Sequence, residues 1–139
     1  MQGHVSRRLA ALGTALMLSV TFAGCQKAKP VATAADIAAA QADAQKEIEQ
    51  AHAEAKKDVK NAAKLSGGDA RDVALARVTG SFDIAMANAD GAHKVALEQC
   101  LTLSPPEQQP CKDRADADYQ TAAANAKAQR VAQQQKTTS

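Results

Sequence analysis

The chain has 139 residues, with 17 Lys and Arg, 15 Asp and Glu, two Phe, one Tyr and no Trp. This length suffices for one small domain, and so few aromatic side chains exclude a large globular core. No segment alternates apolar with polar residues, so a half-buried β-strand is not expected. The composition predicts an all-α protein, an elongated helical hairpin or three-helix bundle, because Ala is the best helix former.

The first 25 residues have the organisation of a bacterial secretory signal. Two arginines precede an apolar run of about 14 residues, which is shorter than the ~20 that span a bilayer. The run ends in the small-residue sequence Ala23-Gly24-Cys25. This end resembles the lipobox of bacterial lipoproteins, although Phe22 stands where that family usually has Leu. The resemblance implies a signal peptide over residues 1–24 and a lipid such as palmitate on Cys25.

An alternative is an ordinary export signal that is cut after Ala23. The number of cysteines argues against it, because an oxidising compartment favours an even number and this chain has three. If Cys25 is acylated, Cys100 and Cys111 remain as one pair.

The charge of the chain changes when the signal is removed. Loss of Arg7 and Arg8 takes the basic side chains from 17 to 15, which equals the 15 acidic ones. The mature chain is therefore neutral, and nucleic acid, which needs a clustered basic surface, is not an expected partner.

Residues 25–32 are expected to form a lipidated tether, because they are polar and are interrupted by Pro30. An alanine-rich helical domain is expected over residues 33–132. Thr33 and Asp36 have the spacing of a capping box at the start of its first helix.

The first helix is expected over residues 34–65. Ile37, Ile48 and Val59 follow one another at 11-residue steps, close to three helical turns, so they share one face. The opposite face is expected to carry five charged residues: Lys46, Glu49, Lys56, Lys57 and Lys60.

A Ser-Gly-Gly-Asp break precedes a second helix, expected over residues 70–100, with Asp69 as its cap. Apolar residues at alternating three- and four-residue steps predict one buried stripe. The stripe consists of Leu75, Val78, Phe82, Ala85, Met86, Ala89, Ala92, His93, Ala96 and Cys100. Gly80 and Gly91 each cost about 1 kcal/mol relative to Ala, so they mark either close helix contacts or soft spots.

The third helix is expected over residues 110–132. Pro105 and Pro106 are assigned to a turn, and Pro110 is tolerated only in a first helical turn. One face would consist of Cys111, Ala115, Tyr119, Ala122, Ala126 and Gln129. Residues 133–139 are polar and are expected to form a flexible tail.

Cys100 and Cys111 flank this proline-rich turn. If the two helices turn back on each other, the Cα atoms can reach the ~4.4–6.8 Å that a disulfide requires. A metal site would need more ligands nearby, and a redox role usually shows a C-x-x-C spacing, which the sequence lacks. The sequence therefore predicts a structural disulfide between them.

The other polar residues form no chemistry-bearing pattern. His52 and His93 lie on different predicted helices and would bind a metal only if the bundle brought them together. Asp113, Asp116 and Asp118 lack the spacing around a central Gly that calcium loops show. We also find no nucleophile motif, phosphate loop or paired catalytic carboxylates in the sequence. The sequence therefore predicts no enzyme activity, no metal and no cofactor.

The mature part of the chain resembles small alanine-rich helical lipoproteins. The resemblance implies a membrane-anchored periplasmic protein with a structural or protein-interaction role at the cell envelope. The alternative is a periplasmic helical chaperone or stress-response protein that holds unfolded clients. Leu103-Ser104 with Glu107-Gln108 is similar to the Leu-Thr-x-x-Gln motif of small periplasmic stress chaperones, with one residue more in the spacing.

The expected partners are a lipid bilayer, reached through acylated Cys25, an envelope protein and a second copy of the chain. Gln26 stands where enteric lipoproteins of the inner membrane have Asp. The expected location is therefore the cell membrane, as a lipid-anchored protein of the outer membrane that faces the periplasm.

Overall fold

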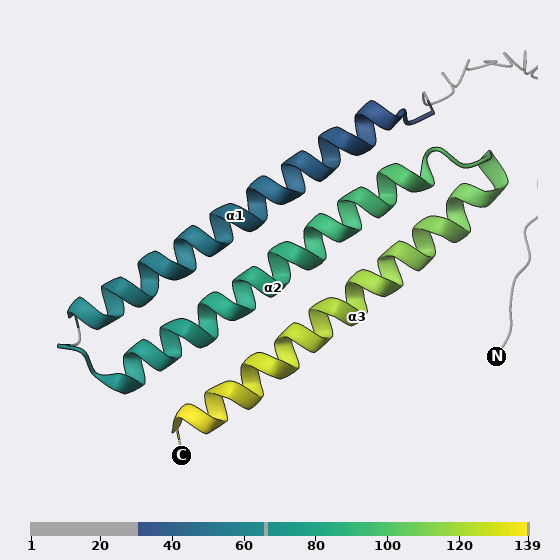
Figure 1. Ribbon diagram of the computed structural model, residues 1–139. Coiled ribbons are helices and arrows are strands. Elements are labelled where there is room, and N and C mark those ends of the chain that lie inside the picture. The colour runs from purple at the N-terminus through teal and green to yellow at the C-terminus, as the bar shows by residue number, and fades with distance from the viewer. Residues whose placement is uncertain (1–30, 66, 139) are drawn as a thin grey trace, which may run out of the picture.

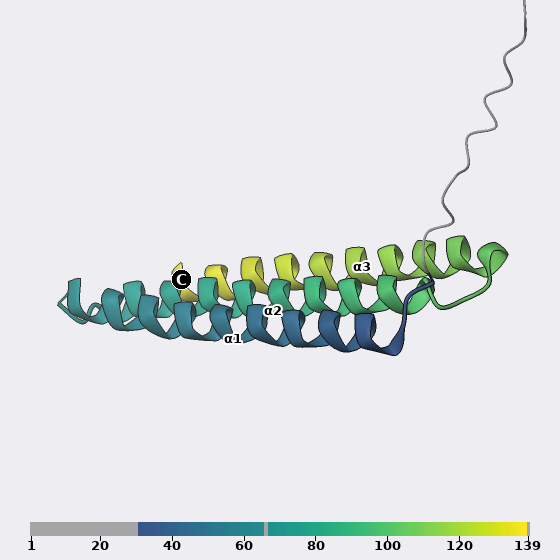
Figure 2. The same cartoon turned by 90° about the horizontal axis from the view of Figure 1, so that it is seen from above.

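The computed structural model describes residues 31–65 and 67–138. These residues form three helices, α1 (Ala34–Leu65), α2 (Ala70–Cys100) and α3 (Pro105–Thr138), and no strand. The helices run antiparallel and side by side with α2 in the middle (Figure 1), and the view turned by 90° shows an elongated layer (Figure 2). Within the described ranges α1 and α3 each pack on α2 and do not approach one another. The all-α prediction is confirmed, and the expected signal peptide and Cys25 lie outside the described residues.

The starts of α1 and α2 follow the capping signals of the sequence. The Thr33 backbone N–H donates to Asp36 Oδ2 at 2.7 Å, and the Asp36 N–H donates to Thr33 Oγ1 at 3.3 Å, which is a reciprocal capping box. Asp69 accepts from the Arg71 backbone N–H at 2.8 Å and caps α2. Both helices therefore have the predicted bounds.

The α1–α2 contact depends on the two glycines inside α2. A Cβ atom at Gly80 would lie 2.6 Å from Ala55 Cβ, and one at Gly91 would lie 2.9 Å from Ala44 Cβ. Both values are far shorter than the ~3.5–4.0 Å at which carbon atoms rest. The glycines thus mark close helix contacts rather than soft spots. They are 11 residues apart, as are the two alanines that face them, so the contact repeats after about three turns.

The opposite side of α2 packs against α3. Phe82 lies under the Arg130 guanidinium, whose Cζ is 4.2 Å from the ring centroid. Since Phe82 follows Gly80 by two residues, the two positions are about 200° apart on the helix. The single predicted stripe of α2 therefore describes only the α3 side. A second side of α2 faces α1, with Gly80 and Gly91 at the close contact and the half-buried Ile84 and Val95 beside them, and Ala92 of the predicted stripe is exposed.

The core is as thin as the composition indicates. Among the described residues the buried apolar side chains are Ala44, Val78, Ala89, Cys100, Ala115, Ala123 and Ala126. On α3 the predicted Ala122 is exposed and the neighbouring Ala123 is buried instead, while Gln129 is exposed and Arg130 is half-buried. The side of α3 that faces α2 is therefore turned slightly from the predicted one.

The predicted bounds of α3 are wrong at both ends. The helix begins at Pro105, five residues early, because the first-turn N–H groups that Pro105 and Pro106 lack need no helical partner. Pro110 lies inside the helix rather than at its start. Residues 133–138, expected as a tail, are helical, because no Gly or Pro interrupts them.

Candidate functional site

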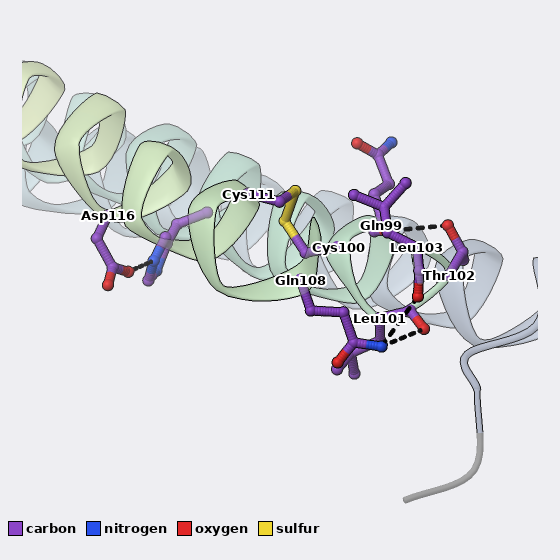
Figure 3. Close-up of a disulfide and its surroundings, with 9 residues drawn as sticks. Gln99, Cys100, Leu101, Thr102, Leu103, Gln108, Cys111 and Asp116 are labelled. Carbon is purple, nitrogen blue, oxygen red and sulfur yellow. Dashed lines mark hydrogen bonds and ion pairs between the residues drawn. A yellow bond between two sulfur atoms is a disulfide. The ribbon is translucent and has the colours of Figure 1, made fainter. Parts of the chain in front are cut away.

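The cysteine pair stands where α2 ends and α3 begins. The sulfur atoms of Cys100 and Cys111 are at bonding distance, and their Cα atoms are 5.5 Å apart, within the usual range of disulfides. Figure 3 shows the bridge between the last turn of α2 and the start of α3. Cys100 is 1% exposed, the least of the described apolar core residues. The bridge therefore fixes the α2–α3 hairpin at its turn.

Hydrogen bonds close the turn beside this disulfide. Ser104 Oγ donates to Glu107 Oε2 at 2.5 Å, and the Glu107 N–H donates to the Ser104 carbonyl at 2.9 Å. Gln108 Nε2 donates to the carbonyls of Leu103 and Leu101 at 3.1 and 3.5 Å (Figure 3). The residues that are similar to the chaperone motif therefore cap α3 and hold its turn.

A polar cluster joins α2 to α3, with His93 about two turns before Cys100. The ring of His93 stacks on Tyr119 with centroids 4.9 Å apart, and His93 Nε2 lies 2.6 Å from Asp116 Oδ1. A hydrogen bond to Asp90, helped by the charge of that carboxylate, raises the pKa of Tyr119. The Asp116 side chain is 55% exposed. Water therefore competes with this polar contact between His93 and Asp116, and the contact acts as a modest link between the helices.

The remaining candidate ligands are not brought together. His52 lies exposed on α1, whereas His93 packs against α3 on the other side of α2. Asp113 accepts a hydrogen bond from Gln109, and Asp118 borders a hollow beside Tyr119. In the described part of the chain no three His, Cys, Asp or Glu side chains could hold a metal ion.

One ion pair connects α1 to α2. Lys94 Nζ donates to both carboxylate oxygens of Glu47, each at 2.6 Å. This hydrogen bonding, with smaller contributions from the charges of Glu47, Asp90 and Asp43, raises the pKa of Lys94. The pair borders a hollow that also includes Asp43 and Glu98, so this side of the α1–α2 contact is acidic.

A basic groove lies elsewhere along the same helix pair, and the sequence did not predict it. Its volume is about 570 Å³. Its polar lining is His52, Lys56, Lys60, Arg77 and Ser81, and its apolar lining is Ala55, Val59, Gly80 and Ile84. Lys56 and Lys60 were expected on the face of α1 opposite to the apolar one, and that placement is wrong because both border α2. His52, Lys56 and Lys60 follow one another at four-residue steps, and this spacing is the signal that could have located the groove.

The described part of the chain includes no helix long and apolar enough to span a bilayer. Comparisons with protein-family profiles, with curated proteins and with solved structures produced no match. The arrangement of the described residues is therefore the basis for the functional proposals below.

Proposed function

We propose that the protein is a small membrane-anchored periplasmic lipoprotein with a structural or protein-interaction role at the cell envelope, and that Cys25 carries the lipid. The N-terminal pattern of a charged region, an apolar run and Ala23-Gly24-Cys25 supports the anchor. The open arrangement of the helices supports the interaction role.

The observation that carries the interaction role is that α1 and α3 do not approach one another. They cover two opposite sides of α2 and leave its other two sides open along the layer (Figures 1 and 2). With 31 residues α2 is about 46 Å long, so these open sides are extended. Such a shape offers long surfaces to a partner and encloses no substrate.

The alternative role, a chaperone that holds unfolded clients, would need a contiguous apolar surface. Among the described residues the exposed large apolar side chains are Val31, Leu65, Leu103 and Val131. Val31 precedes α1, Leu65 ends α1, Leu103 lies in the α2–α3 turn and Val131 lies in the C-terminal part of α3, so they are dispersed. The described surface therefore favours the interaction role over the chaperone role.

The anchor is tested by metabolic labelling with a fatty acid. Cys25→Ser should abolish labelling and leave an unprocessed precursor. The matched control, Cys100→Ser with Cys111→Ser, retains Cys25 and should be labelled normally. A wild-type protein that is processed normally but carries no lipid would disprove the anchor.

The interaction role is tested by a photo-reactive amino acid in living cells. Placed at Asn88, on an open side of α2, it should yield one cross-linked product with one envelope protein. The control position is Lys46, which is exposed on α1 and borders no groove between the helices. The same products from both positions, or none from Asn88, would contradict the proposal.

A further inference from the structure

One wall of the basic groove between α1 and α2 is a ridge of three basic side chains on α1. His52, Lys56 and Lys60 are spaced by four residues, so they are neighbours along one line of the helix. The residues three positions before and after Lys56 are Ala53 and Val59, so no acidic residue of α1 can pair with it at helical spacing. Lys56 and Lys60 carry like charges four residues apart, an arrangement that destabilises a helix, and their repulsion is not relieved within α1.

A further positive charge comes from the other wall of the groove. Arg77 projects from α2, and its helical neighbours at three and four residues are uncharged: Val73, Ala74, Gly80 and Ser81. Within the described ranges no ion pair involves Lys56, Lys60 or Arg77. The lining of the groove includes no carboxylate. The groove thus lacks an anion of its own.

The floor of the groove is apolar, and the groove is open to solvent. Ala55 and Gly80 bring the two helix backbones together, and the side chains of Val59 and Ile84 border the hollow above them. The volume of about 570 Å³ lies within the ~300–1,000 Å³ of ordinary small-ligand sites. The groove therefore combines a positive rim with an apolar base.

We propose that this groove binds a phosphate-bearing amphiphile, with the phosphate on Lys56, Lys60 and Arg77 and the apolar part over Val59 and Ile84. A phosphate carries enough charge to neutralise more than one cation, and it accepts both the planar fork of an Arg and the point charges of Lys. The proposal does not depend on the membrane anchor, because it uses the residues of the groove alone.

The ligand could be dissolved or could be a headgroup in a bilayer, and calorimetry with different probes separates these sources. The mature chain, residues 25–139 with Cys25→Ser, is used, so that neither an attached acyl group nor the apolar run of the signal competes. The dissolved probes are inorganic phosphate and dihexanoyl phosphatidic acid below its micelle concentration. The bilayer probes are phosphatidylcholine vesicles with and without phosphatidic acid.

The test variant is Lys56→Gln with Lys60→Gln and Arg77→Gln. It should bind dihexanoyl phosphatidic acid or the acidic vesicles at least about tenfold more weakly, since it loses several charge-assisted contacts. The matched control changes Lys46, Lys57 and Arg71 to Gln. It has the same two helices and the same charge change, but its three positions are exposed and lie outside the groove. Its affinity should stay within about twofold of wild type, because exposed distant charges are screened.

Each outcome decides the proposal. Binding of the dispersed lipid, lost in the test variant and kept in the control, supports a dissolved ligand. Binding of only the vesicles with phosphatidic acid, with the same difference between the variants, supports a headgroup. Equal loss in both variants would show a non-specific charge effect and overturn the proposal. Binding of inorganic phosphate as tight as that of the lipid would show that the apolar floor contributes nothing and would overturn its proposed role. The absence of binding to any probe would overturn the whole proposal.

Discussion

Gly80→Ala is the sharpest test of how α1 and α2 pack. The added Cβ would lie 2.6 Å from Ala55 Cβ and 3.1 Å from Ala55 Cα. Carbon atoms rest about 3.5–4.0 Å apart, so the two helices would have to separate by about 1 Å. Ala55 has no flexible side chain that could move aside instead.

Two opposing effects determine how Gly80→Ala changes the free energy of unfolding. Replacing Gly by Ala inside a helix gains about 1 kcal/mol in helix propensity. Overpacking a close contact typically costs 1–3 kcal/mol, and here the separation would also loosen the Gly91–Ala44 contact of the same helix pair. We therefore expect a net loss of about 1–2 kcal/mol in the free energy of unfolding. For a domain of this size each kcal/mol corresponds to about 4–8 °C in Tm.

Thermal and urea denaturation, followed by circular dichroism, measure this loss. Gly91→Ala is the internal comparison, because its added Cβ would lie 2.9 Å from Ala44 Cβ and 3.5 Å from Ala44 Cα, so its loss should be smaller. Combining Gly80→Ala with Ala55→Gly moves one methyl group across the contact and should recover part of the loss. A Gly80→Ala protein more stable than wild type, or strictly additive effects in the pair, would refute the close contact.

Three other predictions concern the turns and the first cap. Cys100→Ser with Cys111→Ser opens a covalent loop of about 12 residues and should lower the free energy of unfolding by roughly 3 kcal/mol, as the chain-entropy model gives for such a loop. Thermal denaturation with and without a reducing agent measures this loss, and a Tm unchanged by reduction would contradict it. Gly68 has a φ of 85° and open space around it, so Gly68→Ala should lower the free energy of unfolding by about 1 kcal/mol through backbone strain alone. Urea denaturation measures this loss. Hydrogen bonds from Thr33 lower the pKa of Asp36 from 3.8, so its stabilising effect is present above pH 3.8 and is lost as the pH falls through the lower folded value. Amide exchange at the start of α1 should rise in that range, and Asp36→Asn should remove the pH dependence.

The features that could be predicted from the sequence are those with local causes. Thr33 and Asp36 define the start of α1 through neighbours three residues apart, and Asp69 does the same for α2. Gly67 and Gly68, between these helices, adopt φ values of 65° and 85°, which favour Gly over other residues. The all-α fold and two of the three helix spans were predictable because each depends on signals within a few residues.

The features that could not be predicted depend on which residues meet across helices. Gly80 and Gly91 carry no apolar side chain, so the predicted stripe omitted the α1 side of α2, although Ile84 and Val95 lie there. The register that places Gly80 on Ala55 also places Arg77 near Lys56 and Lys60, and thereby forms the basic groove. At α3 the prolines predicted a turn, but Ser104 and Glu107 cap a helix that begins at Pro105, so Pro105 and Pro106 lie in its first turn. Local sequence signals are enough to predict that a helix forms. Which residues of two helices lie opposite one another depends on contacts between distant segments.

The open layer follows from the way α2 distributes its small residues. Gly80 and Gly91 admit α1 so closely that its axis is fixed on one side, while Phe82 and Cys100 hold α3 on the other. Because positions two apart on a helix are about 200° apart, the two neighbours of α2 stand opposite one another and cannot meet. A closed bundle would require both neighbours on one side of α2 and would cover its open sides. The same spacing that produces a thin core therefore leaves the basic groove accessible. The thin core, the open layer and the accessible groove thus have one structural cause.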